Sequence, residues 1–226
     1  MGKKTKRFFR ILKDKLIIFE NSISDIFGRR YYKKLRNGFE GKKISIIANN
    51  CVGGVIYHQI GCSFESPTIN LKFDDNDFIK FLKNFDSYLE AELEEIETKQ
   101  AYPVGVLKLS SGEFITVYFV HYKSFKEAKQ KWDSRKKRID KSNMYVIFDT
   151  CGTKNVERMK ALIKSFNELD YKNKLFLTTL DLDGENVERV NMPDLKTNGN
   201  WITKRNKSLY RRYCDLLDYR KIFNIK

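Results

Sequence analysis

The sequence predicts an α/β fold with a mixed, largely parallel sheet and flanking helices, in a Rossmann-like three-layer arrangement. Short β-branched runs alternate with segments whose apolar residues recur at helical spacing. Residues 144–179 form a strand–helix–strand pattern, which is the right-handed crossover that joins parallel strands. The 226 residues are 41% hydrophobic and include only 3 Pro and 12 Gly, so the chain has enough apolar material for one packed domain.

The N-terminal segment, residues 1–37, predicts a basic amphipathic helix that precedes a single α/β domain over residues 42–226. It contains twelve basic and three acidic residues, so it carries nine of the fifteen net positive charges. Its apolar residues recur every three or four positions, at Phe8, Leu12, Leu16, Phe19, Ile23 and Ile26. A basic helix with such a stripe favours an anionic membrane surface. Packing of the stripe on the protein's own core is the alternative.

Composition argues against several classes of protein. No uncharged apolar run approaches the roughly 18 residues of a spanning helix, and the basic N-terminus lacks a secretory signal. Four cysteines without a Cys-x-x-Cys pair, and only two histidines, indicate reduced thiols and no metal cluster. The basic clusters lack an RNA-recognition or finger signature, so nucleic acid is not an expected partner. We expect a cytoplasmic protein, peripheral at the inner face of the cytoplasmic membrane.

The first structural unit of the domain is a strand, a loop and a helix. Residues 44–48 predict a buried strand, residues 49–54 a loop of small residues, and residues 55–60 a helix that ends at Gly61. In an open α/β sheet, such loops at the carboxyl ends of strands are where ligands bind. Residues 75–89 predict the next helix.

The remaining elements continue the alternation. Residues 104–109 and 114–120 are expected to form a hairpin, and a helix is expected after the capping box Ser124–Glu127. Strands are expected at residues 144–148 and 175–179. Helices are expected at residues 156–169 and, as a basic helix, from about residue 204. Several chemically capable side chains follow these strands directly, which makes the strand ends the place to search for a site.

Three such side chains are a thiol, an imidazole and a carboxylate, at Cys51, His121 and Asp149. If their strands run parallel in one sheet, the three meet at one edge. A helix N-terminus and an imidazolium favour the thiolate, and an acid orients the ring, as in a Cys-His-Asp nucleophilic site. Gly53 and Gly54 would bare backbone N–H groups for an oxyanion or a phosphate. A buried small residue, a polar strand end and a loop cap are the alternatives for the three.

Further side chains are expected to bind a sugar or a phosphate around this site. They are Asn49, Asn50, Tyr57, Ser66, Tyr122, Lys123, Trp132, Arg135 and Arg138. Arg135 and Arg138 are three residues apart on one helical face and offer planar donor forks to a phosphate. No cofactor is expected. The alternative is a divalent metal, for which Asp181 and Asp183 are the nearest candidate pair.

One run of residues carries a specific resemblance. Residues 46–57, Ile-Ile-Ala-Asn-Asn-Cys-Val-Gly-Gly-Val-Ile-Tyr, followed by Ser66-Pro67-Thr68, resemble the opening of a bacterial family, the domain of unknown function 1919. The runs 102–105, 121–139 and 173–174 also match it, so the resemblance covers about residues 42–180. Typical members have an aromatic residue after the cysteine, where this chain has Val52.

This resemblance implies a role in exopolysaccharide or capsule biosynthesis, because the family is frequently labelled so. We expect a transferase, most simply a glycosyltransferase, that binds a nucleotide-sugar or a lipid-linked glycan. A neighbouring cysteine-peptidase-like group shares the order of Cys, Ser-Pro and Arg-rich segments. A cysteine-dependent acyltransferase or hydrolase is therefore one alternative, and a non-catalytic accessory protein is another. The formation of a homo-oligomer is left open.

Overall fold

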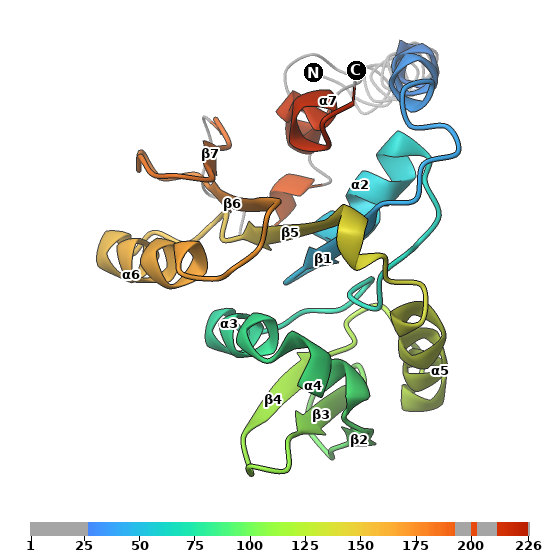
Figure 1. The fold of residues 1–226 in the computed structure, drawn as a ribbon, viewed down its shortest axis with the longest axis vertical. Coiled ribbons are helices and arrows are strands. Elements are labelled where there is room, and N and C mark those ends of the chain that lie inside the picture. Colours follow the sequence, from blue (N-terminus) through green and yellow to red (C-terminus); the bar gives the residue numbers. More distant parts are fainter. Residues whose placement is uncertain (1–26, 193–199, 203–211, 226) are drawn as a thin grey trace, which may run out of the picture.

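The computed structural model describes residues 27–192, 200–202 and 212–225. Two sheets form its framework (Figure 1). The parallel sheet has the order β1-β5-β6-β7, with β1 at Ser45–Ala48, β5 at Met144–Asp149, β6 at Lys174–Thr178 and β7 at Val187–Arg189. The antiparallel sheet has the order β2-β3-β4, with β2 at Leu93–Glu95, β3 at Val104–Lys108 and β4 at Phe114–Tyr118. The predicted mixed α/β class is confirmed.

Helices cover both faces of the parallel sheet. The labelled helices are α2 (Val52–Ile60), α3 (Asp75–Lys83), α4 (Phe85–Glu90), α5 (Phe125–Lys136), α6 (Val156–Asn167) and α7 (Tyr219–Ile222), with short 3-10 turns η1 (Lys141–Asn143), η2 (Asn200–Ile202) and η3 (Tyr213–Leu216). Figure 1 shows α2 and α7 on one side of this sheet and α3 and α6 on the other, with the antiparallel sheet beyond α3. The single helix expected over residues 75–89 is divided at Asn84 into α3 and α4.

Two hydrophobic clusters lie on the opposite faces of the parallel sheet. Ile46 and Ala48 point towards α2, whereas Ile47 points into the cluster shared with α3 and α6. This alternation follows from the two-residue period of a strand. Both faces are buried, which explains the nearly continuous apolar sequence of β1 and β5.

The outer edge of β1 is covered by side chains instead of another strand. The hydroxyl of Tyr57 accepts a hydrogen bond from the Ile46 N–H at 2.9 Å, and Thr68 Oγ1 accepts one from the Ala48 N–H at 3.0 Å. Ser66 Oγ lies 3.0 Å from Thr68 Oγ1. Tyr57 and Ser66, which the sequence analysis assigned to substrate binding, are thus buried and complete the edge of the sheet.

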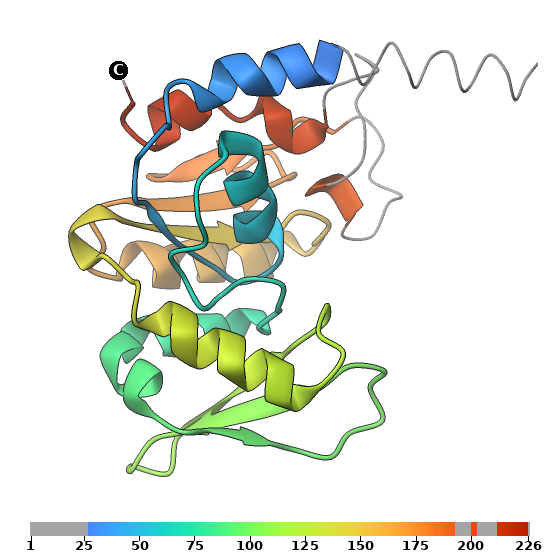
Figure 2. The same ribbon diagram turned by 90° about the vertical axis from the view of Figure 1, so that its right-hand side faces the viewer.

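The helix of residues 27–36 packs on the domain near the C-terminal end of α2 (Figure 2). The Arg36 guanidinium donates to the carbonyls of His58 and Gln59 at 2.7 and 3.2 Å, and the Tyr32 hydroxyl donates to the Asp215 carboxylate at 2.7 Å. The predicted apolar stripe lies at residues 8–26, outside the described residues. Among the helices that are described, none is long and apolar enough to cross a membrane.

Candidate functional site

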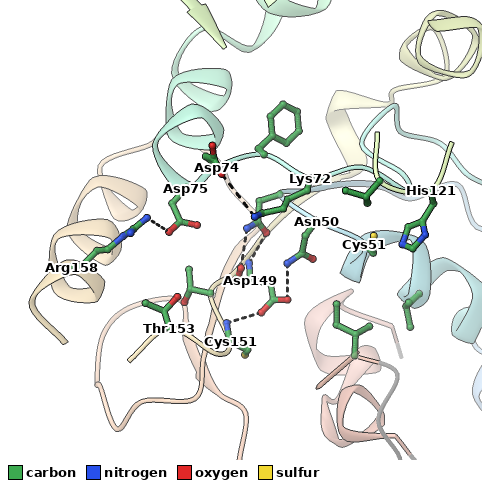
Figure 3. Close-up of a pocket in the computed structure, with 16 residues that line it drawn as sticks. Asn50, Cys51, Lys72, Asp74, Asp75, His121, Asp149, Cys151, Thr153 and Arg158 are labelled. Carbon is green, nitrogen blue, oxygen red and sulfur yellow. Dashed lines mark hydrogen bonds and ion pairs between the residues drawn. The ribbon is translucent and has the colours of Figure 1, made fainter. Parts of the chain in front are cut away.

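A cavity of about 680 Å³ opens at the carboxyl ends of β1 and β5 (Figure 3). Its walls come from the loops that follow these two strands, from the segment that precedes α3, from the residues after β4 and from η2. We call Asn49, Asn50, Cys51, Asp149 and Cys151 the inner wall. We call Lys72, Asp74, Asp75, Thr153 and Arg158 the rim.

Cys51, His121 and Asp149 all line this cavity, as the positions of the strands predicted. The reason differs from the predicted one, because β4, which precedes His121, belongs to the antiparallel sheet. The three strands therefore do not share one parallel sheet. Paired backbone hydrogen bonds of 2.7 and 2.9 Å between Lys72 and Tyr118 tie β4 to the segment before α3. This bridge brings His121 to the cavity.

The Asp149 carboxylate accepts hydrogen bonds from three neighbours. These are the Asn50 amide at 2.9 Å, the Cys151 backbone N–H at 2.9 Å and the Trp201 indole N–H at 2.9 and 3.1 Å. Burial raises the pKa of Asp149 above its ordinary value, although these donors favour the ionised form. Within the described residues, His121 is not a hydrogen-bond partner of Asp149, so this carboxylate fixes the loops and η2 instead of orienting the imidazole.

The two asparagines join the loop after β1 to β5. The Asn49 amide donates to the Asp149 carbonyl and accepts from the Asp149 N–H, both at 2.9 Å, which extends the β1–β5 ladder by a side chain. Asn50 Oδ1 accepts the N–H of Val52 at 2.9 Å, in the first turn of α2. Both amides line the cavity, but they are already engaged within the protein.

Cys51 stands at the N-cap of α2 and is partly exposed. Burial raises the pKa of its thiol to about 11, so the thiol is neutral near pH 7. Its sulfur lies 3.9 Å from the Leu71 carbonyl, and within the described part of the chain no hydrogen bond joins it to His121. The exposed His121 imidazole shares the cavity with the thiol. A base would have to take the proton of Cys51 before its sulfur could act as a nucleophile.

Two ion pairs form the rim. Arg158 Nη2 lies 2.6 Å from Asp75 Oδ2, and Lys72 Nζ lies 3.9 Å from Asp74 Oδ1 (Figure 3). The sequence did not predict these residues, or Trp201, as part of the site. The only local signals were the polar run Thr150–Asn155 after β5 and the two aspartates, Asp74 and Asp75, at the start of α3.

Comparison with known proteins places the whole chain in one family. The family described as "Domain of unknown function (DUF1919)" matches residues 6–224. The chain belongs to this family. A protein of Haemophilus influenzae (strain ATCC 51907 / DSM 11121 / KW20 / Rd), described as an uncharacterized protein, is 31% identical over 205 residues, which cover 87% of this chain and 89% of the relative. The resemblance noted over residues 42–180 is thus confirmed and extends in both directions.

The two glycines of the family's Asn-Asn-Cys run do not form the floor of the cavity. A Cβ on Gly53 would lie 3.1 Å from the Ala48 Cβ, and a Cβ on Gly54 would lie 3.4 Å from the Asn70 side chain. Neither glycine lines the cavity. They let α2 pack closely on β1 and on the segment before α3. Their expected role as an oxyanion or phosphate cradle stays a prediction.

The predicted phosphate residues on α5 also have another role. Arg135 is buried, donates to the Tyr122 hydroxyl at 2.8 Å and stacks 5.0 Å over the Phe64 ring. Arg138 donates to the Phe64 carbonyl at 3.2 Å, and Tyr122 donates to the Ile69 carbonyl at 3.0 Å. These groups hold the segment between α2 and α3. The sequence could not show that this segment covers α5.

The last predicted residues lie away from the cavity. Trp132 is buried in the core against Phe81, and Lys123 lines a shallow groove beside β3. Asp181 is paired with Arg189. Among the described residues, no group of three His, Cys, Asp or Glu side chains is arranged to hold a metal ion.

Proposed function

We propose that this protein is a glycan-modifying transferase of bacterial surface polysaccharide biosynthesis, most simply a glycosyltransferase. The observation that carries the proposal is the cavity at the carboxyl ends of β1 and β5. Its volume of about 680 Å³ suits a small-molecule ligand, and its position is the usual one in open α/β sheets. Carboxylate, hydroxyl, imidazole and cationic side chains line it, which are groups that hydrogen-bond to sugar hydroxyls and phosphates.

The proposed chemistry uses groups on both sides of the cavity. The exposed imidazole of His121 takes the proton of an acceptor hydroxyl while the hydroxyl oxygen attacks the donor sugar carbon. The bond from that carbon to the leaving phosphate oxygen breaks. The cations Lys72 and Arg158 stabilise the charge that develops on the leaving group.

A cysteine-dependent acyltransferase or hydrolase is the second candidate. It is favoured by one observation, namely that the Cys51 thiol and the His121 imidazole line the same cavity. His121 would take the thiol proton while the sulfur attacks an acyl carbonyl and expels the leaving group. The resulting thioester would pass its acyl group to a sugar hydroxyl or to water. The raised pKa of Cys51, about 11, is the reason for placing this candidate second.

The proposed location is the inner face of the cytoplasmic membrane. Exposed basic side chains on the described helix, Arg29, Arg30 and Lys34, support attraction to anionic lipid. The strong dependence of such attraction on ionic strength offers a simple check, because salt screens exposed charges. Binding to phosphatidylserine vesicles that is unchanged between low and high salt would contradict this location.

Complementation of a deletion strain tests the proposed function. Mass spectrometry of the surface polysaccharide should show a missing or altered unit in the deletion strain, restored by the wild-type chain. Under glycosyl transfer, Cys51→Ser restores the unit and His121→Ala does not. Under thiol chemistry, both variants fail. If both restore it, the protein is an accessory factor, and an unchanged polysaccharide in the deletion strain would overturn the proposal.

A further inference from the structure

Arg158 occupies an unusual place for a cation. It is the third residue of α6, in the first turn of a helix, where free N–H groups make the positive end of the helix dipole. The Asn155 side chain accepts the backbone N–H of Arg158 at 3.0 Å and caps this turn. The guanidinium and the helix end both attract an anion, and the Asp75 carboxylate from α3 occupies that position at 2.6 Å.

A second cation lines the same cavity from the segment that precedes α3. Lys72 is paired with Asp74 at 3.9 Å, and these two side chains are 57% and 58% exposed. The Arg158 side chain is 55% exposed, whereas the side chain of its partner Asp75 is 19% exposed. The Lys72–Asp74 pair is exposed and contributes little to stability, so a ligand can exchange with the Asp74 carboxylate at little cost. Figure 3 shows Lys72, Asp75, Thr153 and Arg158 around one mouth of the cavity.

We propose that the rim binds a diphosphate, which replaces Asp75 as the partner of Arg158 and is shared with Lys72 and the Thr153 hydroxyl. A diphosphate is favoured over a carboxylate because Asp75 is a tethered carboxylate, and a free anion with a single charge would compete poorly with it. Several charges and bidentate acceptor oxygens on one ligand overcome this disadvantage. This inference deepens the proposed function, on which it rests for the identity of the leaving group.

The same assignment replaces the predicted phosphate site on α5. The guanidinium of Arg135 is buried on Tyr122 and Phe64, so it has no access to a ligand. Arg158 keeps donor groups that Asp75 does not use, since a guanidinium has five N–H donors. The structure therefore moves the phosphate partner from α5 to the start of α6.

Calorimetry on the full chain tests the diphosphate site without requiring turnover. The probes are inorganic pyrophosphate, uridine diphosphate and farnesyl diphosphate. Arg158→Ala should weaken pyrophosphate binding about ten- to hundredfold, the usual range for a hydrogen bond to a charged group. Asp75→Asn should tighten it roughly two- to fivefold, because the competing carboxylate is removed. Lys160→Ala is the matched control on α6, since Lys160 pairs with Glu157 outside the cavity, and it should bind as the wild type does.

The two rim variants are expected to change pyrophosphate affinity in opposite directions, which makes the result decisive. Loss of fold in Arg158→Ala cannot mimic the gain expected for Asp75→Asn. Tighter binding of uridine diphosphate than of pyrophosphate identifies a nucleotide source, tighter binding of farnesyl diphosphate identifies a lipid source, and equal binding identifies the diphosphate alone. Absence of pyrophosphate binding, or equal affinity in the wild type and Asp75→Asn, would overturn the site. Either result would leave the polysaccharide phenotype, and with it the proposed function, intact.

Discussion

The inner wall and the rim of the cavity differ in how their polar groups are used. In the inner wall, Asp149 is buried and accepts hydrogen bonds from Asn50, Cys151 and Trp201. At the rim, Lys72 and Arg158 are more than half exposed and are paired with Asp74 and Asp75. The comparison indicates that the inner wall maintains the shape of the site. The rim is the part that can exchange its partners for a ligand.

Removal of the Asp149 carboxylate should give the largest difference in stability between the inner wall and the rim. Asp149→Ala should lower the free energy of unfolding by about 2–4 kcal/mol, because unsatisfied buried donors cost about 1–3 kcal/mol each and relief from burying a charge offsets part of the loss. Asp74→Ala at the rim should change it by less than about 0.5 kcal/mol. Urea unfolding measures both. Equal losses would contradict the contrast between wall and rim.

The contribution of Asp149 to folding stability is expected to decrease as the pH rises. Burial raises the pKa of Asp149 in the folded state above its ordinary value of 3.8. A carboxyl with a raised pKa binds its proton more tightly in the folded state, so its contribution to stability is greatest below 3.8 and falls as the pH rises through the folded-state pKa. As the pH rises from 3.8 through the folded-state pKa, the stability advantage of the wild type over Asp149→Ala should therefore shrink. Urea unfolding at a series of pH values measures this advantage. An advantage that grows would show that the donors outweigh burial.

Two buried tryptophans provide a matched comparison. Trp201 donates its indole N–H to Asp149, whereas the indole N–H of Trp132 finds no hydrogen-bond partner among the described residues. Both side chains are 1% exposed. Trp201→Phe should thus cost about 1–2 kcal/mol more than Trp132→Phe in thermal or urea unfolding. If Trp132→Phe costs as much or more, the indole–carboxylate bond does not stabilise the inner wall.

Cys51 in the cavity and Cys214 in the buried cluster around α2 should differ in their reactivity. Burial raises the pKa of Cys51 to about 11 and that of Cys214 to about 12. Since the thiolate reacts, Cys51 should be alkylated by iodoacetamide about tenfold faster than Cys214, with both rates rising as the pH increases. Peptide mass spectrometry at several pH values measures the two rates. A Cys51 rate that is already maximal near pH 7 would favour the thiol enzyme.

A small effect on stability is also expected at the rim cation Arg158. Arg158→Ala removes one ion pair whose arginine is 55% exposed, and it should change the free energy of unfolding by less than about 1 kcal/mol. The same variant is expected to lose most of its diphosphate affinity. A large loss of stability, measured by urea unfolding, would instead make Arg158 a structural link between α6 and α3.

The sequence predicted the elements that have strong local patterns. The apolar runs of β1 and β5 and the amphipathic α6 lie close to their expected ranges. Because loops after parallel strands meet at one edge, it also predicted that Cys51 and Asp149 share a cavity. The break at Asn84 that divides α3 from α4 has no comparable signal in the helical spacing.

The rest of the site depends on tertiary contacts that no local pattern contains. Arg158 and Asp75 are 83 residues apart, and Trp201 and Asp149 are 52 residues apart. Arg135 lies on a basic helix, which predicted exposure, yet the segment at Phe64 covers it. Helical spacing shows which side chains share a face but does not show what packs on that face.

The most direct test of the central claim, that the cavity binds a phosphate-bearing glycan donor, is capture of ligands from cells. The purified chain would be equilibrated with the small-molecule and lipid extract of its source organism, and the retained molecules identified by mass spectrometry. We predict that the wild type and Lys160→Ala retain a sugar that carries a diphosphate, and that Arg158→Ala does not. Retention of molecules without phosphate, or equal retention by Arg158→Ala, would contradict the account.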